Sequence, residues 1–525
     1  MSKIFNTILT EYKMSNQSAN NKRIAKNTLM LYIRMLITMV VGLFTSRVVL
    51  QSLGVEDYGI YNIVGGFVSL FSLLSGSLSA AISRFLTFEL GKGNIENLRK
   101  VFSSAVTIQI GLSLIIVILA ETVGLWFLNS KLVIPEERMF AAHCVYQLSI
   151  LTFVISLISV PYNAAIMAHE RMSAFAYMSI LDVTGKLLIA YSLYYATIDR
   201  LILFAILGAI LSLLNRLIYG IYCKKNFEEC SYLFIFDRTL LKTMFGFAGW
   251  NFIGASSAVL RDQGGNIIMN MFGGPAVNAA RGIAMQVNSC VHGFVGNFMV
   301  ALNPQITKSY ASGEHAYMMS LIYKGARFSY YILLLLSLPI IINASYILNL
   351  WLGIVPEHTV AFVQLVLIFA MSESLASPLV TAMLATGKIR NYQLVVGGLQ
   401  MMNLPLSYIL LRCGYPPESV LIVAIFISVC CEMSRLYMLR NMIQLSMRSF
   451  LREVYFNVIG VSLVSAVLPL VLFFILPDNF LGFVVNCIVC VLSTMLVILY
   501  LGLKKGERQM IYEKVTNIVR KKCRL

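Results

Sequence analysis

The chain has 525 residues, of which 58% are hydrophobic and only 12% are charged. An ordinary soluble domain is about one quarter charged, so this chain lacks the polar residues that the surfaces of several soluble domains would need. A soluble globular protein is therefore excluded. The net charge of +17 leaves nucleic acid, an anionic lipid surface or membrane topology as explanations.

The first part of the chain, residues 1–27, is polar and basic and has no apolar signal-peptide core, so we expect a cytoplasmic N-terminal tail. Apolar runs of about 20 residues, long enough to cross a bilayer, follow it with only short connectors. Their approximate ranges are 28–50, 59–85, 103–127, 140–168, 173–197, 200–223, 245–270, 279–305, 323–347, 359–386, 392–411, 417–440, 453–476 and 480–503. The pattern predicts an all-α integral membrane protein with about 14 transmembrane helices.

The basic residues indicate the orientation. If the N-terminal tail is inside, 30 of the 41 lysines and arginines fall on the cytoplasmic side and four fall outside. The positive-inside rule then places both termini in the cytoplasm. The basic tail 504–525 is interpreted as a topology anchor that meets membrane lipids, and nucleic acid is not expected as a partner.

No enzyme signature is visible in the sequence. The ten cysteines fall largely in apolar runs, the five histidines are scattered, and no glycine-rich phosphate loop is present. We expect neither a metal nor a cofactor. A membrane glycosyltransferase or polymerase is the competing class, and the short outer connectors argue against it.

Three matches at a nearly constant offset predict an internal repeat. Residues 53–59 align with 273–279 and residues 87–93 with 307–313, both at an offset of 220, and residues 161–165 align with 378–382 at an offset of 217. The offset covers six helices, so both halves have the same orientation. We predict two six-helix bundles related by a pseudo-two-fold axis along the membrane normal. The predicted parts are the bundles 28–223 and 245–440, a cytoplasmic linker 224–244, and an appended pair of helices within 453–503.

Four local motifs carry a resemblance to a known family. They are the turn Leu53-Gly54-x-x-Asp57-Tyr58-Gly59-Ile60-Tyr61, the helix end Arg84-Phe85, the loop Gly91-Lys92-Gly93, and a helix with Pro161 and Ala168 seven residues apart. Over about residues 24–503 the chain resembles the MATE-like/MOP superfamily, and within it the polysaccharide and O-antigen flippase branch. The resemblance implies a multi-pass protein of the bacterial inner membrane that flips lipid-linked oligosaccharide. We expect it to act as a monomer, loosely associated with polysaccharide assembly enzymes.

Charged residues inside the predicted spans are the candidate functional residues, because each costs about 2.5–3.5 kcal/mol at mid-bilayer on insertion scales. Arg34 and Arg261 lie deep in spans that are repeat mates, and Asp182 and Lys186 are four residues apart on one helix face, where they can pair. The predicted substrate-binding residues are Arg34, Arg47, Arg84, Lys186, Arg261 and Arg281. The predicted charge partners, or binding groups for a coupling H⁺ or Na⁺, are Asp182, Asp262 and Glu373.

Two alternatives stay open for these charges. They can be buried ion pairs that hold the bundles together, and Arg47 and Arg84 can reach the interface by snorkelling. The functional interpretation is a cationic central cavity, because arginine binds phosphate in a bidentate fork. Tyr58, Tyr61, Trp250 and Tyr392 are candidates for stacking on sugar rings. The alternative function is a MATE-type multidrug or small-molecule cation antiporter.

Overall fold

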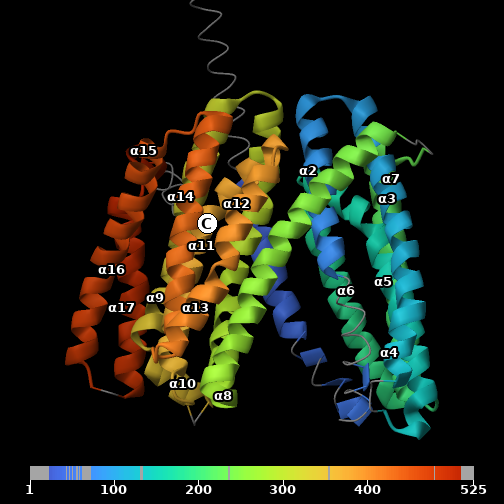
Figure 1. Ribbon diagram of the computed structural model, residues 1–525, viewed down its shortest axis with the longest axis horizontal. Coiled ribbons are helices and arrows are strands. Elements are labelled where there is room, and N and C mark those ends of the chain that lie inside the picture. Colours follow the sequence, from blue (N-terminus) through green and yellow to red (C-terminus); the bar gives the residue numbers. More distant parts are fainter. Residues whose placement is uncertain are drawn as a thin grey trace, which may run out of the picture. The chain divides into compact units, whose positions relative to one another are not determined.

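The structure is a computed structural model. It describes residues 23–42, 44–45, 48–49, 51–54, 57, 60–61, 72–130, 134–233, 237–352, 355–477 and 479–509. Within these ranges every regular element is a helix and no strand occurs (Figure 1). The predicted all-α membrane fold is confirmed.

Eleven helices in the described ranges are long and apolar enough to cross a membrane. They overlap eleven of the fourteen predicted spans, and they cover Arg23–Gly42, Ile95–Ser130, Glu136–Ala168, Met172–Tyr195, Arg200–Asn226, His315–Ile342, Thr359–Thr386, Arg390–Arg412, Ser419–Ile443, Met447–Ile475 and Phe480–Gly502. The other three predicted spans are 59–85, 245–270 and 279–305. The first overlaps α2 (Ser72–Lys92) and lies partly outside the described residues, and the other two both lie within α8 (Arg238–Ala311). The total of fourteen therefore remains a prediction.

The chain divides into two compact units, which we describe separately. Unit 1 comprises residues 1–256 and 300–314, and unit 2 comprises residues 257–299 and 315–525. The predicted boundaries of the two bundles remain predictions.

In unit 1, α5 (Met139–Ala168) is the central helix. It packs against α2, α3 (Ile95–Leu119) and α7 (Arg200–Asn226), and α6 (Met172–Ser192) packs on α7. The small residues Ala141 and Ala142 are buried beside Val145 and Tyr146, and they let neighbouring helices approach closely. The Tyr146 hydroxyl donates a 2.8 Å hydrogen bond to the Ala120 carbonyl, in a π-helical turn at the end of α3, which satisfies both polar groups.

The long element α8 is helical over 74 residues, but its path reverses. Arg281 Nη2 donates a 2.9 Å hydrogen bond to the carbonyl oxygen of Asp262. In a straight helix these residues would be about 28 Å apart, at about 1.5 Å per residue. The reversal falls between them, where the sequence has Gly273-Gly274 followed by Pro275. It agrees with the predicted connector between spans 245–270 and 279–305.

In unit 2, α11 (Thr359–Thr386) is the central helix and packs against α9 (His315–Ile342) and α14 (Ser419–Ile443). The remaining elements of this unit are α10 (Ala344–Leu352), α12 (Arg390–Met401), α13 (Asn403–Arg412) and α15 (Met447–Phe450). The appended pair α16 (Phe456–Ile475) and α17 (Phe480–Val497) pack on each other and on α9 (Figure 1).

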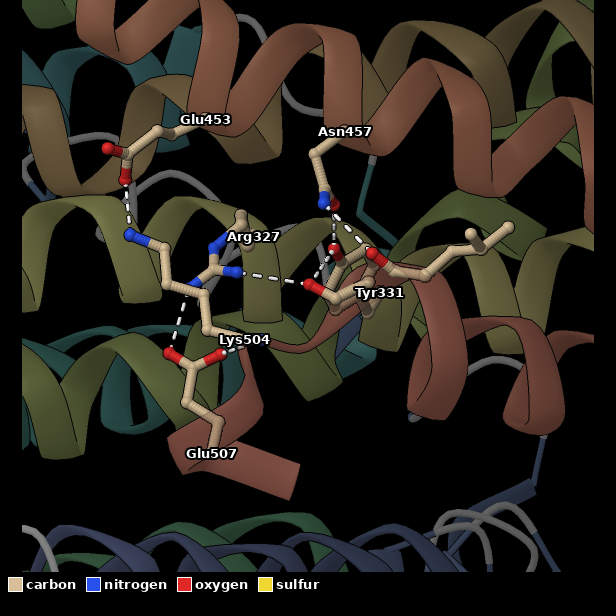
Figure 2. Close-up of polar contacts among 8 residues, drawn as sticks. Arg327, Tyr331, Glu453, Asn457, Lys504 and Glu507 are labelled. Atoms are coloured by element: carbon tan, nitrogen blue, oxygen red, sulfur yellow. Dashed lines mark hydrogen bonds and ion pairs between the residues drawn. The ribbon is translucent and has the colours of Figure 1, made fainter. Parts of the chain in front are cut away.

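A polar cluster holds this C-terminal pair to α9. The side chain of Arg327 in α9 is only 2% exposed, and it contacts Glu507 at 2.8 Å and the carbonyl of Gly502 at 3.0 Å. Figure 2 shows this cluster, in which Lys504 forms a second ion pair with Glu453 and Tyr331 bonds to Asn457. Arg327 of α9, and Glu453 in the π-helical turn Leu451–Tyr455 before α16, are thereby matched with groups that follow α17.

Residues that the predicted repeat aligns also share an unusual backbone conformation at the ends of α5 and α11. Glu170 after α5 and Gly387 after α11 are 217 residues apart, and both have left-handed φ angles, of 58° and 76°. Gly93 and Gly313, which are 220 residues apart, also share left-handed values, of 72° and 75°. A left-handed angle favours glycine, so Glu170 is the exception among the four.

The interactions of Glu170 account for that exception. Its side chain is fully buried in unit 1 and lies 2.8 Å from Arg23 Nε and 2.8 Å from Lys308 Nζ, while Gln305 donates to it at 2.6 Å. Asn27 donates to its carbonyl oxygen at 3.2 Å. Two cations and an amide thus offset a backbone conformation that costs about 1–2 kcal/mol for a residue other than glycine.

Candidate functional site

Unit 1 has a cavity of about 810 Å³ between the first helix (Arg23–Gly42), α5, α6 and α7. Three of the predicted functional residues line it: Arg34, Asp182 and Lys186. These three residues are two cations and one carboxylate, so the wall has a net charge of +1. The volume lies within the range of about 300–1,000 Å³ that is usual for small-molecule sites.

Arg34 is held against α6. Its guanidinium lies over the ring of Phe175, 4.8 Å from the centroid, and Nη1 donates to the Ser179 hydroxyl at 3.4 Å. A cation over an aromatic face keeps its charge while it is partly shielded from water. Arg34 is therefore a positively charged group on the wall of a cavity inside the membrane-spanning region.

The predicted pairing of Asp182 with Lys186 is confirmed. Lys186 Nζ lies 2.8 Å from one carboxylate oxygen of Asp182, and Asn215 in α7 donates to the other oxygen at 2.7 Å. The pair therefore links successive turns of α6 and fixes α6 to α7 across the cavity wall. The lysine side chain remains 59% exposed, so it stays accessible from the cavity.

Unit 2 has a smaller cavity of about 190 Å³, lined by α8, α11, α13 and α14. Four predicted functional residues line it: Arg261, Asp262, Arg281 and Glu373. Two arginines face two carboxylates, so the fixed charges of this wall balance. Sequence reasoning missed His292 and Asn288, which lie one helical turn apart on α8 and also line this cavity.

Each of the main contacts in the unit 2 cavity involves a charged side chain. Arg261 Nε lies 2.9 Å from Asp262 Oδ1, and its guanidinium lies 5.1 Å from the centroid of Phe369. The Ser428 hydroxyl donates to Glu373 at 2.7 Å. Arg281 is buried, and its contact with the Asp262 carbonyl ties the two limbs of α8 together.

The other predicted residues lie elsewhere. The guanidinium of Arg84 lies over Phe85, Phe88 and Phe247, at 4.7, 4.6 and 5.7 Å from their centroids, and Arg84 lines neither cavity. Arg47 falls outside the described residues.

Among the stacking candidates, Tyr61 lines the cavity of unit 1 and packs edge-on against Phe204, with centroids 4.9 Å apart. Trp250 and Tyr392 line neither cavity, and Tyr58 falls outside the described residues.

The motif residue Asp57 has a structural role. Arg138 Nε donates to Asp57 at 2.8 Å, and Arg138 Nη1 donates to Asp199 at 2.6 Å. Asp199 also accepts hydrogen bonds from the backbone N–H groups of Leu201 and Ile202 and so caps α7. One arginine therefore joins three connectors at the same end of unit 1.

No protein-family model matches the chain. Among curated proteins it is 19% identical over 326 residues to the uncharacterized membrane protein EpsK of Bacillus subtilis (strain 168), which covers 61% of this chain and 63% of that protein. The chain thus matches less than two thirds of that relative's length.

The solved structures to which it is similar are transporters. One is the outward-facing conformation of a multidrug resistance MATE family transporter of the MOP superfamily, with a TM-score of 0.69 and 13% identity over 81% of this chain and 96% of that chain. A mutant of the Vibrio cholerae MATE transporter VcmN gives 0.66 and 16% over 81% and 98%. A MOP superfamily transporter from Pyrococcus furiosus, described as having a binding pocket of reverse polarity, gives 0.65 and 13% over 80% and 96%. The chain thus has the fold of MATE transporters.

Proposed function

We propose that this protein moves a polyprenyl-pyrophosphate-linked oligosaccharide across the bacterial inner membrane by alternating access, with both termini in the cytoplasm. The headgroup passes along a cationic path to which Arg34 and Arg261 contribute, while the lipid tail stays in the bilayer. It works as a monomer, loosely associated with the enzymes of polysaccharide assembly.

The observation that carries the proposal is the cavity of unit 1, which has a volume of about 810 Å³ and a wall that carries hydroxyl and amide groups and a net positive charge. A pyrophosphate that enters hydrocarbon loses its hydration, and arginine replaces it with two parallel hydrogen bonds. Arg34 meets this need because its contacts with Phe175 and Ser179 hold the guanidinium at the wall. A cationic drug would be repelled by the same wall.

We propose the carboxylates Asp262 and Glu373 as the groups that exchange a coupling H⁺ or Na⁺. They share the small cavity of unit 2, where Arg261 and Arg281 balance their charge. Binding a cation there changes the net charge of the site, and a coupling site needs this property. Asp182 is the equivalent candidate in unit 1.

The test is transport in proteoliposomes that contain a fluorescent polyprenyl-pyrophosphate oligosaccharide. Replacing Arg34 or Arg261 by alanine should lower the flipping rate at least tenfold, because each change removes a charge-assisted contact worth about 1.5–3 kcal/mol. Arg216→Ala is the matched control. Arg216 also lies over an aromatic ring, 3.9 Å from the centroid of Tyr162, but it lines neither cavity. Wild-type rates in Arg34→Ala and Arg261→Ala would refute the cationic path.

A second assay separates the alternative function. Vesicles loaded with a cationic dye should lose it at the same rate with and without the protein. Active dye efflux would favour the multidrug or small-molecule cation antiporter, whose fold this chain shares.

A further inference from the structure

The helix α5 has a polar stripe that none of the predictions anticipated. Its members share one face, at spacings of three and four residues, and all of them line the cavity of unit 1. They are Ser149, Thr152, Ser156, Ser159 and Asn163. The stripe includes every serine and threonine of α5 and extends about 21 Å, which is most of the thickness of a bilayer core.

The stripe offers hydrogen-bond acceptors. The Ser156 hydroxyl donates to the Thr152 carbonyl at 2.9 Å, and the Ser159 hydroxyl donates to the Ile155 carbonyl at 2.8 Å. Each hydroxyl has one proton and two lone pairs, so donation along the helix leaves the oxygen able to accept. The side-chain oxygen of Asn163 is buried and has no hydrogen-bond partner among the described residues. A ligand with many O–H donors matches such a surface.

The fold itself does not require this stripe, as unit 2 shows. At the predicted repeat offset of 217, the five positions correspond to Val366, Phe369, Glu373, Ala376 and Val380 of α11. Three of these, Val366, Phe369 and Glu373, line the cavity of unit 2, so the same helix face is used. Among the described residues, hydroxyl groups therefore line the cavity of unit 1 and not that of unit 2.

The adjoining helix α7 supplies further polar groups to the same cavity. On α7, Ser212, Asn215 and Tyr219 also recur at spacings of three and four residues and line the cavity. The rings of Tyr61, Phe175 and Phe204 add apolar faces to the wall. Hydroxyl and amide groups beside flat aromatic faces are suited to a sugar ring, which has O–H groups at its edge and C–H groups on its faces.

We propose that the cavity of unit 1 binds neutral carbohydrate, with the α5 stripe accepting hydrogen bonds from sugar hydroxyls, and that the cavity of unit 2 does not. This inference rests on the proposed function, because it assigns the glycan part of the same substrate to one unit. It adds that the sugars contribute affinity beyond that of the pyrophosphate.

The experiment measures binding to the full-length protein in nanodiscs, with two probes: a polyprenyl pyrophosphate without sugar, and the same lipid carrying a neutral hexose trisaccharide. The wild type should bind the glycan-bearing lipid at least tenfold more tightly. The stripe variant, Thr152→Val with Ser156→Ala, should lose about tenfold for the glycan-bearing lipid and nothing for the bare lipid, since it removes two hydrogen bonds.

The matched control is Ser113→Ala with Thr122→Val, which removes the same two hydroxyl types. Ser113 donates to the Gln109 carbonyl and Thr122 to the Ile118 carbonyl, both at 2.7 Å, and neither residue lines either of the two cavities described above. Its affinities for both lipids should equal those of the wild type. Thermal unfolding midpoints of all variants report whether they remain folded.

The outcomes separate the two proposals. If the bare lipid binds and the sugars add nothing, or if the stripe variant keeps the sugar-dependent gain, the carbohydrate inference is overturned and the proposed function stands. An equal loss for both lipids in the stripe variant also overturns it. If neither lipid binds the wild type, the proposed function fails and the inference fails with it.

Discussion

The cavities of the two units share one design element but differ in the rest of their walls. In each, an arginine lies over a phenylalanine ring, Arg34 over Phe175 in unit 1 and Arg261 over Phe369 in unit 2. The unit 1 cavity is about 810 Å³, hydroxyl-rich and net positive, whereas that of unit 2 is about 190 Å³ with balanced charges. The same helix positions can thus serve a wide polar site in one unit and a small ionic site in the other.

The largest expected effect comes from making unit 1 like unit 2 at the end of α5. Glu170→Gly introduces the residue type found at position 387 and relieves the left-handed strain of about 1 kcal/mol. It also leaves Lys308, whose side chain is 20% exposed, without its carboxylate. We expect a net loss of about 3 kcal/mol in the free energy of unfolding, measured by equilibrium unfolding in mixed micelles. Gly387→Ala should lose about 1 kcal/mol from strain alone; a stabilised Glu170→Gly variant would contradict this account.

The second prediction compares the two arginines. Arg261→Ala removes the ion-pair partner of Asp262 and leaves Asp262 and Glu373 with one cation, Arg281, in the same small cavity, so we expect a loss of about 2 kcal/mol in unfolding free energy. This is less than for a fully buried pair, because the Asp262 side chain is 44% exposed. Arg34→Ala removes a hydroxyl contact and a ring contact and should cost about 1 kcal/mol or less. If both variants lose the same unfolding free energy in this experiment, the difference in net charge between the two cavities does not affect stability.

The third prediction tests whether charge decides what the unit 1 cavity binds. Ser156→Glu introduces the carboxylate that unit 2 has at the aligned position 373 and cancels the net positive charge of the wall. Affinity for the glycan-bearing lipid should fall about tenfold, because the added charge repels the pyrophosphate. Ser156→Gln has nearly the same size without the charge and should lose less. If both variants lose the same affinity, the size of the new side chain causes the loss and its charge does not.

The smallest effect concerns pH and the connectors of unit 1. Burial alone would raise the pKa of Asp199, but hydrogen bonds from the Ile202 N–H, from Arg138 and from the Leu201 N–H together lower it. A carboxyl group with a lowered pKa stabilises the fold above its unfolded pKa, and that stability is lost as the pH falls through the folded value. Between pH 7 and pH 3 the wild type should therefore lose slightly more stability than Asp199→Asn. Parallel pH curves for the two proteins would contradict the prediction.

The unit 2 counterpart of that connector differs in chemistry. His358 Nδ1 lies 2.6 Å from Glu418, which directly precedes α14 as Asp199 precedes α7. Arg138 in unit 1 thus corresponds to a histidine in unit 2. Arg138→His would make the two connectors alike and should increase the pH dependence of unfolding in unit 1, because a guanidinium stays charged whereas an introduced imidazole can lose its proton.

The sequence predicts most of the helices because a membrane span needs about 20 apolar residues and little else. It also predicts the Asp182–Lys186 pair, because a spacing of four places both on one helix face. The α5 stripe could have been found by the same spacing rule, since Ser149, Thr152, Ser156 and Ser159 follow it. Charged and aromatic residues stand out in an apolar span, whereas serine and threonine do not, so the stripe escapes a prediction that rests on charge and aromatic rings.

Other features could not be predicted from local patterns. Glu170 meets Lys308, which is 138 residues away, and Arg327 meets Glu507, which is 180 residues away. Such contacts depend on how distant helices pack, which spacing rules do not describe. Arg281 is a further case: the span pattern places it at the outer end of its helix, yet the reversal of α8 brings it to the Asp262 carbonyl.

The cluster around Arg327 has a practical consequence for engineering this protein. A truncation after residue 503 would remove Glu507 and leave a 2% exposed guanidinium without its carboxylate. An affinity tag or a fluorescent fusion should therefore leave residues 504–509 in place, because Glu507 in this segment contacts α9. A shorter version should express poorly even though it keeps all the predicted spans, and restoring residues 504–509 should recover its yield.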